Sequence, residues 1–506
     1  MFTDLILLIG TNPLPNFVVI DYFLNKNPNL NNIWLICSQS NHSQGGTSTI
    51  AENLMYFVRE RHSEKFFDIK LEALTDVSSK SKIESDLAET DFITEIKEDN
   101  RYFHFNYTGG TKAMSTHVHS ILSGIKNDKS EFSYLDTRNF RLMRDDKEQP
   151  IESEMLKKVT ISADELIKLH GWNKEEDEIH SVIIGNGAAM DAFIELIGGE
   201  KSDADKVRNA LYFEEGAYSR ERFKRVKKTF TLTKENIGCL SKIIDEEKRK
   251  PLTKVFEDFS KTKTKDEEHL IKITKDRLGT DKPYADLLLQ LADIKIKDPK
   301  WPKNKGQLSF KGFKPNVKFQ TINNVLPEHL RVFDKCGNFN EDINFKNDNY
   351  KKAVQFFDGK WLETYIFHLI KSELDKFPNV SVVNNIKPYK KVRTSETGEK
   401  KKVDFEIDIV VIDGYHLTGI SCTTDKKKDV CKNKGFEILH RTKQMGGDEA
   451  KSILITFMND KIKQEVQTEL ETTTGTIGGN VLVLGSNDLK KETLIGKVVN
   501  FIKPVQ

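Results

Sequence analysis

The chain has 506 residues, of which 37% are hydrophobic and 31% are charged, a composition that excludes a largely disordered chain and predicts two or three hydrophobic cores. Its 79 Lys and Arg residues nearly balance its 77 Asp and Glu residues, for a net charge of +2. No overall basic excess therefore indicates a nucleic-acid partner, and any such contact depends on local patches.

The apolar run at residues 5–9 follows an acidic residue rather than a basic stretch, and it is too short for a signal peptide. No apolar segment has the length of a membrane span. We therefore expect a cytoplasmic protein with no membrane contact. The five cysteines lack paired CxxC spacing, which favours reduced, mostly buried thiols over a zinc site or a disulfide framework.

Short apolar runs alternate with helix-like segments over residues 1–150. Strands are expected at residues 5–9, 33–37 and 102–107, and helices at residues 17–24, at residues 50–61 and up to residue 122. This βαβ order predicts a parallel sheet covered by helices, which is a Rossmann-like α/β domain.

Residues 151–349 have a different pattern. Charged amphipathic stretches at 241–259 and 267–278 predict a mainly helical middle or linker region, and their charges are expected on solvated helix faces. The Pro- and Lys-rich segment 297–315 predicts a loop.

Residues 350–506 form a third predicted unit of the α/β class. Apolar residues at helical spacing predict a helix around 361–367. After it we expect a strand at residues 380–385, a basic hairpin up to residue 402, and strands at 405–412 and 416–422. A helix at 431–446 and a strand at 452–457 follow.

Three predicted strand ends in the first domain carry small polar residues, at 10–16, at 38–40 with 47–49, and at 106–112. Ligands bind beyond the carboxyl ends of parallel strands. Glycines admit backbone N–H groups to an anion, hydroxyls donate to phosphate, and Lys112 adds a charge. Since the usual dinucleotide and ATP fingerprints are absent, a different phosphate ligand is implied. Residues 108–111 alone would equally suit a helix cap and turn, but three such loops at one edge favour binding.

The segments Gly-Thr-Asn-Pro-Leu-Pro-Asn at 10–16 and Asn-Tyr-Thr-Gly-Gly-Thr-Lys at 106–112 resemble those of the CRISPR-associated Rossmann-fold (CARF) sensor domains. The resemblance implies that two protomers pair and cradle a cyclic oligoadenylate, commonly cyclic tetra-adenylate. By this resemblance the pocket is lined by Thr11, Asn12, Ser38, Thr108, Gly109, Gly110, Thr111 and Lys112.

Three carboxylates stand out in the third unit. Metal-dependent phosphodiester hydrolysis requires carboxylates to hold Mg or Mn ions, usually with a lysine that orients water or steadies the transition state. Glu363 lies on the predicted helix, whereas Glu406 and Asp408 open a strand two residues apart, so that both point to one face. An acid at the mouth of a buried strand is a poor structural choice, which favours function.

The third unit resembles the PD-(D/E)xK nuclease domain of CARF-fused, cyclic-tetra-adenylate-activated DNA and RNA nucleases of type III CRISPR systems. The match rests on Trp-Leu-Glu-x-Tyr at 361–365, Glu-Ile-Asp-Ile-Val-Val at 406–411 and Ile-Ser-Cys at 420–422. It implies catalytic roles for Glu363, Glu406, Asp408 and Ser421, with Mg or Mn held by Glu363 and Asp408. The motif lysine aligns with Thr423, and Lys426 or Lys402 is expected to supply its charge.

Basic residues around this region, among them Lys402, Lys427, Lys434 and Arg441, suit contact with a phosphate backbone. The leading hypothesis is a homodimeric endonuclease that a cyclic oligoadenylate switches on, with DNA or RNA as its substrate. A second hypothesis, supported by Thr423, is a ligand-gated protein that binds nucleic acid or a partner without cutting. A third makes the sensor domain a slow phosphodiesterase that degrades its own ligand through Lys112.

Overall fold

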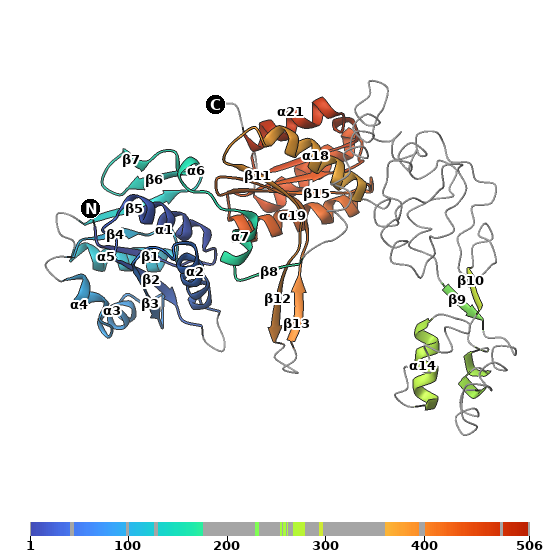
Figure 1. Cartoon of the computed structure of the whole chain (residues 1–506), viewed down its shortest axis with the longest axis horizontal. Coiled ribbons are helices and arrows are strands. Elements are labelled where there is room, and N and C mark those ends of the chain that lie inside the picture. The colour runs from blue at the N-terminus through green and yellow to red at the C-terminus, as the bar shows by residue number, and fades with distance from the viewer. Residues whose placement is uncertain are drawn as a thin grey trace. The chain divides into compact units, whose positions relative to one another are not determined.

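The computed structural model of the chain (Figure 1) describes residues 2–40, 45–97, 101–125, 130–175, 228–231, 253–255, 257–259, 261, 267–278, 293–296, 360–393, 400–475 and 479–503. Contacts divide the chain into two units. One comprises Met1–His180 with Leu362–Gln506, and the other comprises Ser181–Trp361. Each unit is described by itself.

The first part of the larger unit has the expected alternation of strands and helices. Its elements are β1 (Asp4–Leu8), α1 (Leu14–Lys26), β2 (Asn32–Ser38), α2 (Ser48–Arg61), β3 (Asp68–Leu74), α3 (Lys80–Ala88), α4 (Phe92–Ile96), β4 (Phe103–Asn106), α5 (Lys112–Ser123), β5 (Glu131–Asp136), β6 (Arg141–Arg144), β7 (Pro150–Glu152), α6 (Met155–Lys158), α7 (Ala163–Leu169) and β8 (Asn173–Lys174).

The strands β1 to β7 form one seven-stranded sheet of order β3-β2-β1-β4-β5-β6-β7. The first five strands are parallel, and β6 and β7 add an antiparallel edge. Alternate residues of β1 enter opposite cores: Leu5 and Leu7 pack with α1 and α2, whereas Ile6 and Leu8 pack with α3, α4 and α5. Covering both faces explains why the central strands β1 and β2 are mostly apolar, and the arrangement confirms the Rossmann-like fold.

The loops after β1 and β4 meet closely at the carboxyl edge of this sheet. A Cβ atom on Gly109 would lie 2.0 Å from the carbonyl oxygen of Leu8, and one on Gly10 would lie 3.2 Å from the nitrogen of Gly110. Gly110 has a φ of 76°, a conformation that side chains disfavour. The two loops therefore depend on glycine to lie against each other.

The second part of the larger unit contains α18 (Trp361–Leu374), β11 (Val380–Ile386), β12 (Pro388–Arg393), β13 (Lys400–Asp404), β14 (Ile407–Asp413), β15 (His416–Cys422), α19 (Lys428–Gly446), β16 (Lys451–Ile455), α20 (Asp460–Thr474), β17 (Val481–Leu484), a 3-10 turn (Ser486–Asp488) and α21 (Lys491–Ile502). Five of its strands form a mixed sheet of order β11-β14-β15-β16-β17, in which β14 pairs antiparallel with β11 and β15. The strands β15, β16 and β17 run parallel.

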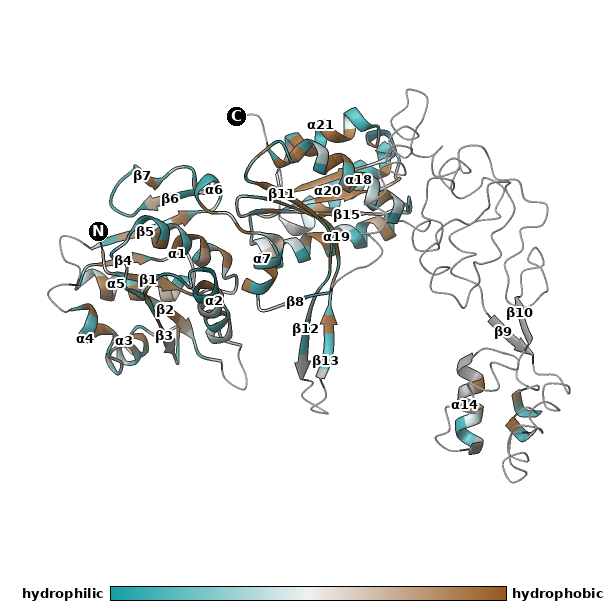
Figure 2. Cartoon of the chain, viewed as in Figure 1, coloured by the Kyte–Doolittle hydropathy of each residue, from teal (hydrophilic) through white to brown (hydrophobic). Residues whose placement is uncertain are grey.

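The strands β14 and β15 are buried along their whole length, and the strands of this sheet are mostly brown in Figure 2. Helix α19 packs on β15: a Cβ atom on Gly419 would meet Thr442 and Ile438, and one on Gly446 would meet Leu417. Helix and strand therefore lie in close contact along several turns of α19.

One hydrophobic core joins the two parts of the larger unit. It contains Leu5 and Leu35 of the first sheet as well as Val410, Leu417 and Met445 of the second part. The strands β12 and β13 form a separate hairpin, to which the short strand β8 adds a third strand. In the part of the chain that the structure describes, no helix is long and apolar enough to cross a bilayer.

The smaller unit contains the antiparallel pair β9 (Lys228–Thr231) and β10 (Asp293–Ile296) and the helix α14 (Glu267–Leu278). The amphipathic stretch 267–278 thus forms the expected helix. Most of the predicted helical middle region, including the stretch 241–252 and the predicted loop 297–315, lies outside the described residues.

We predict that Gly109→Ala lowers the free energy of unfolding by about 1 to 3 kcal/mol, because the added methyl group displaces the backbone of β1. Urea denaturation measures the change. Gly496→Ala in α21, where a Cβ meets no heavy atom within 4 Å, is the control and should be neutral or stabilising. Equal stabilities for the two variants would contradict the close approach of the loops.

Candidate functional site

The helix α18 carries Glu363 in its first turn. Its neighbours Leu362, Tyr365 and Ile366 are buried, and they fix the helix by packing. Glu363 is only partly buried, so its carboxylate reaches the surface of the domain while the helix stays anchored.

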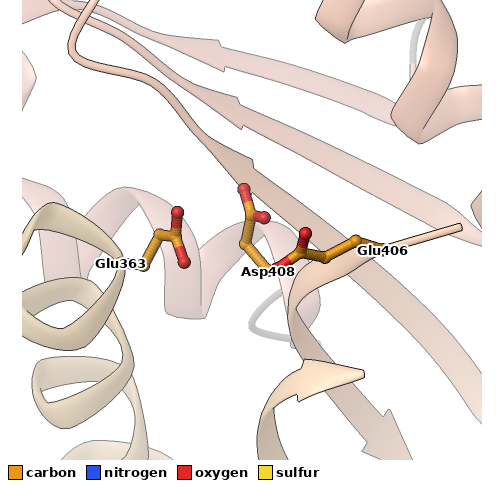
Figure 3. Close-up of side chains that lie close together, drawn as sticks. All are labelled: Glu363, Glu406 and Asp408. Carbon is orange, nitrogen blue, oxygen red and sulfur yellow. The ribbon is translucent and has the colours of Figure 1, made fainter. Parts of the chain in front are cut away.

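Glu406 and Asp408 come from the start of β14. Glu406 immediately precedes the strand, is exposed and has its carboxylate 3.5 Å from the ammonium of Lys387. Asp408 is the second residue of the strand and is 7% exposed. As Figure 3 shows, the carboxylates of Glu363, Glu406 and Asp408 gather between helix and strand, with ligand oxygens within 4.8 Å of one another. The structure therefore brings together the three acids that the sequence singled out.

Two donors from β15 hold Asp408 in place. The Oγ of Ser421 donates to Oδ2 of Asp408 at 3.1 Å, and the backbone N–H of Cys422 donates to the same oxygen at 2.7 Å. Burial, reinforced by the charge of Glu363, raises the pKa of Asp408 to about 7, against the opposing charge of Lys434 and the bond from Cys422. Ser421 thus positions the carboxylate of Asp408.

These groups fit a divalent cation. Carboxylate oxygens are the ligands that Mg²⁺ and Mn²⁺ prefer. Neighbouring carboxylates repel one another when all are ionised, and the repulsion is largest where burial excludes water. A cation bound between Glu363, Glu406 and Asp408 would offset that repulsion.

The lysines predicted to replace the motif lysine lie on two different segments. Lys426 is exposed in the loop after β15, and Lys402 pairs with Glu175 at 2.7 Å and with Asp404 at 3.3 Å. The charge of Lys434, on α19, acts on Asp408 and lowers its pKa. The sequence placed Lys434 only among contacts to nucleic acid, although it precedes the buried Ile438 by one helical turn.

The other predicted nucleic-acid contacts lie at the ends and on the surface of α19. Lys427 is exposed and directly precedes the helix. The guanidinium of Arg441 packs over the ring of Phe405 at 4.8 Å from its centroid. Arg441 therefore supports the chain segment that leads into Glu406.

The loop after β4 is stabilised by its own hydroxyls. Thr108 donates to Oδ1 of Asn106 at 2.7 Å and accepts from the backbone N–H of Leu135 at 2.7 Å. Thr111 caps α5 by accepting from the N–H of Met114 at 3.1 Å. Lys112 follows at the exposed first residue of α5, where the positive end of the helix dipole adds to its charge.

The two other loops differ in how their polar groups are used. Ser38 exchanges hydrogen bonds with Thr47 through backbone and side chain, so it braces its loop. Asn12 accepts from the N–H of Leu14 at 2.9 Å, but its Nδ2 is buried and has no hydrogen-bond partner among the described residues. Thr11 is exposed.

A cleft of about 740 Å³ opens beside these loops. Thr11, Asn12 and Thr108 line it together with residues from the turn after β14 and from the end of α19, among them Tyr415, His440, Lys443 and Gly447. The hydroxyl of Tyr415, like Nδ2 of Asn12, is buried and has no hydrogen-bond partner among the described residues. The cleft is thus lined by aromatic and polar side chains from both parts of the larger unit.

Family models match both parts of the chain. Residues 5–164 match the model of the Card1 CARF domain, and residues 350–478 match that of the Card1-like endonuclease domain. The chain carries a Card1 CARF domain and a Card1-like endonuclease domain. The Rossmann-like sheet with its three loops is thus the CARF domain, and the three carboxylates lie in the endonuclease domain.

Solved structures align with the chain at low sequence identity, and the first of them shares its fold. The crystal structure of VC1899 from Vibrio cholerae aligns with a TM-score of 0.53 at 13% identity, over 99% of this chain and 98% of that protein. A type III CRISPR defence DNA nuclease activated by cyclic oligoadenylate aligns with a TM-score of 0.39 at 12% identity, over 90% of this chain and 45% of its own. Enterococcus italicus Csm6 aligns with a TM-score of 0.22 at 14% identity, over 55% of this chain and 62% of that protein. No curated protein sequence matches.

We predict that Asp408→Asn stabilises the metal-free protein increasingly as the pH rises from about 4 to about 7. The pKa of Asp408 is raised in the folded state, so the stability that its protonated form contributes is lost as the pH rises through that value. Comparing melting temperatures of variant and wild type in EDTA cancels the titration of other groups. Parallel curves for the two proteins would contradict the raised pKa.

Proposed function

We propose that this protein is a metal-dependent nuclease, activated by a cyclic oligoadenylate, that cleaves DNA or RNA in type III CRISPR antiviral defence. The cluster of Glu363, Glu406 and Asp408 in a Card1-like endonuclease domain carries the proposal. The CARF domain at residues 5–164 supports a cyclic oligoadenylate as the activator, and cyclic tetra-adenylate is the first ligand to test.

In this proposal Glu363, Glu406 and Asp408 hold one or two Mg²⁺ or Mn²⁺ ions. The ions would polarise the scissile phosphate and activate water for attack on phosphorus. Ser421 and the N–H of Cys422 keep the carboxylate of Asp408 in position. Hydrolysis adds the hydroxyl of water to phosphorus and its proton to the leaving oxygen.

We propose that the activator binds at the carboxyl edge of the CARF sheet, with Thr11, Asn12, Ser38 and residues 108–112 forming the site. Helix α19 offers a route for activation. Its end contributes Lys443 to the cleft that Asn12 and Thr108 also line, and its first turns pack near the metal carboxylates. A ligand that favours one position of α19 would shift the population of active molecules. In a homodimer, each of the two protomers would contribute one such ligand site and one such helix.

The competing function is a ligand-gated protein that binds nucleic acid without cutting it. Thr423, which stands where the family has its lysine, favours this function. Cleavage assays with Mn²⁺, in the presence and absence of cyclic tetra-adenylate, separate the two functions. Binding of nucleic acid without any cleavage would support the competing function.

We predict that Lys112→Ala weakens binding of cyclic tetra-adenylate by roughly 10-fold or more, since a charge-assisted contact contributes about 1.5 to 3 kcal/mol. Isothermal calorimetry measures the affinity. Lys26→Ala, in the last turn of α1 at the opposite end of that helix from the loop, is the matched control. Unchanged affinity in Lys112→Ala would remove this lysine from the site.

We also predict that Asp408→Ala reduces ligand-activated cleavage by orders of magnitude while the affinity for cyclic tetra-adenylate stays the same, since a metal-bridging carboxylate is lost. Asp413→Asn, at the other end of β14 beside Lys503, is the control for substitutions in this strand. Wild-type cleavage by Asp408→Ala would place the active site elsewhere.

A further inference from the structure

Thr423 occupies the motif position of the lysine and has a structural task there. Its N–H donates to the carbonyl of Ile455 at 2.8 Å, and its hydroxyl accepts from the N–H of Asp425 at 3.2 Å. Thr423 is 4% exposed. A nuclease built on these carboxylates therefore needs its positive charge from another element.

The packing of α19 on β15 identifies that element. Gly446 lies over Leu417, and Thr442 and Ile438 lie over Gly419. Each step of two residues toward the end of β15 thus corresponds to about one turn toward the start of α19. Continued by one step, the same register places the next pair on this side of α19, Ile438 and Lys434, over Ser421.

Asp408 lies on that same face of the sheet. In the antiparallel pair of β14 with β15, Val410 is opposite Gly419, and opposite residues share a face. Two residues before Val410 on β14, Asp408 accepts a hydrogen bond from the hydroxyl of Ser421, which lies two residues after Gly419 on β15. Lys434 and Asp408 therefore lie on the same face of the sheet, toward the end of β15.

The charges around the site agree with this placement. The positive charge of Lys434 lowers the pKa of Asp408 and that of Cys422, against the stronger effect of their burial. Lys434 makes no ion pair within 4.0 Å among the described residues, whereas Lys428 and Lys432 of the same helix pair with Glu469. Lys434 is half-buried, so its charge is only partly screened by water.

We propose that Lys434 of α19 is a catalytic residue that takes the place of the motif lysine absent from β15, an inference that rests on the proposed nuclease function. Its ammonium lies against the scissile phosphate and offsets the negative charge that builds up on the phosphate oxygens as water attacks. The basic group has thus moved from the strand to the facing helix, while its position relative to the carboxylates is retained.

The test uses the full-length protein with Mn²⁺ and cyclic tetra-adenylate. Lys434→Met, which keeps the aliphatic length and removes the charge, should lower cleavage by about a hundredfold or more. Lys432→Met should cleave within about threefold of wild type, because Lys432 pairs with Glu469 and such a surface ion pair contributes little. Adding Thr423→Lys to Lys434→Met should restore part of the lost rate, since it returns a lysine to the same face.

Calorimetry of Mn²⁺ binding without nucleic acid separates catalysis from folding. Lys434→Met should bind Mn²⁺ at least as tightly as wild type, because a positive charge near the cation is removed. Cleavage by Lys434→Met within threefold of wild type would overturn the assignment, and so would a parallel loss of Mn²⁺ affinity and cleavage. A wild-type protein that never cleaves would instead refute the nuclease function itself.

Discussion

A carboxylate buried beside another carboxylate costs free energy that the rest of this domain must supply. Asp408 is nearly inaccessible to water and faces Glu363, so its ionised form is disfavoured by both desolvation and repulsion. The apolar strand β14, the donors of β15 and the buried side of α18 hold the group there regardless. Such an arrangement is retained where a cation or a reaction uses the charge.

The surrounding architecture follows from how that strand is covered. The strands β14 and β15 are buried along their whole length, so both faces of the sheet must be covered by other elements. Helix α19 can approach β15 closely because Gly419 has no side chain to prevent it. The same helix reaches from the carboxylate end of the sheet to the cleft beside the CARF loops.

The CARF edge is built from a similar close approach. Gly109 lies against the backbone of β1, and the hydroxyls of Thr108 and Thr111 are used to shape the loop and cap α5. Consequently these hydroxyls are already used within the loop, whereas Lys112 directly after it is exposed. A rigid loop with few remaining donors suits an anionic ligand, because little order has to be imposed on binding.

The local pattern of the sequence determined the two α/β domains, the three phosphate-type loops and the acids Glu363, Glu406 and Asp408. Strand alternation, apolar periodicity and glycine-rich strand ends are properties of neighbouring residues, so they are readable without the fold. The raised pKa of Asp408, the structural use of Ser38 and Thr423, and the cleft shared with Tyr415 were decided only by tertiary packing. So was the place of Lys434, because no spacing along the chain reveals which turn of α19 lies over which residue of β15. That register depends on side-chain volumes at the contact, above all on the missing side chain of Gly419, and such steric fit exists only once helix and strand have come together.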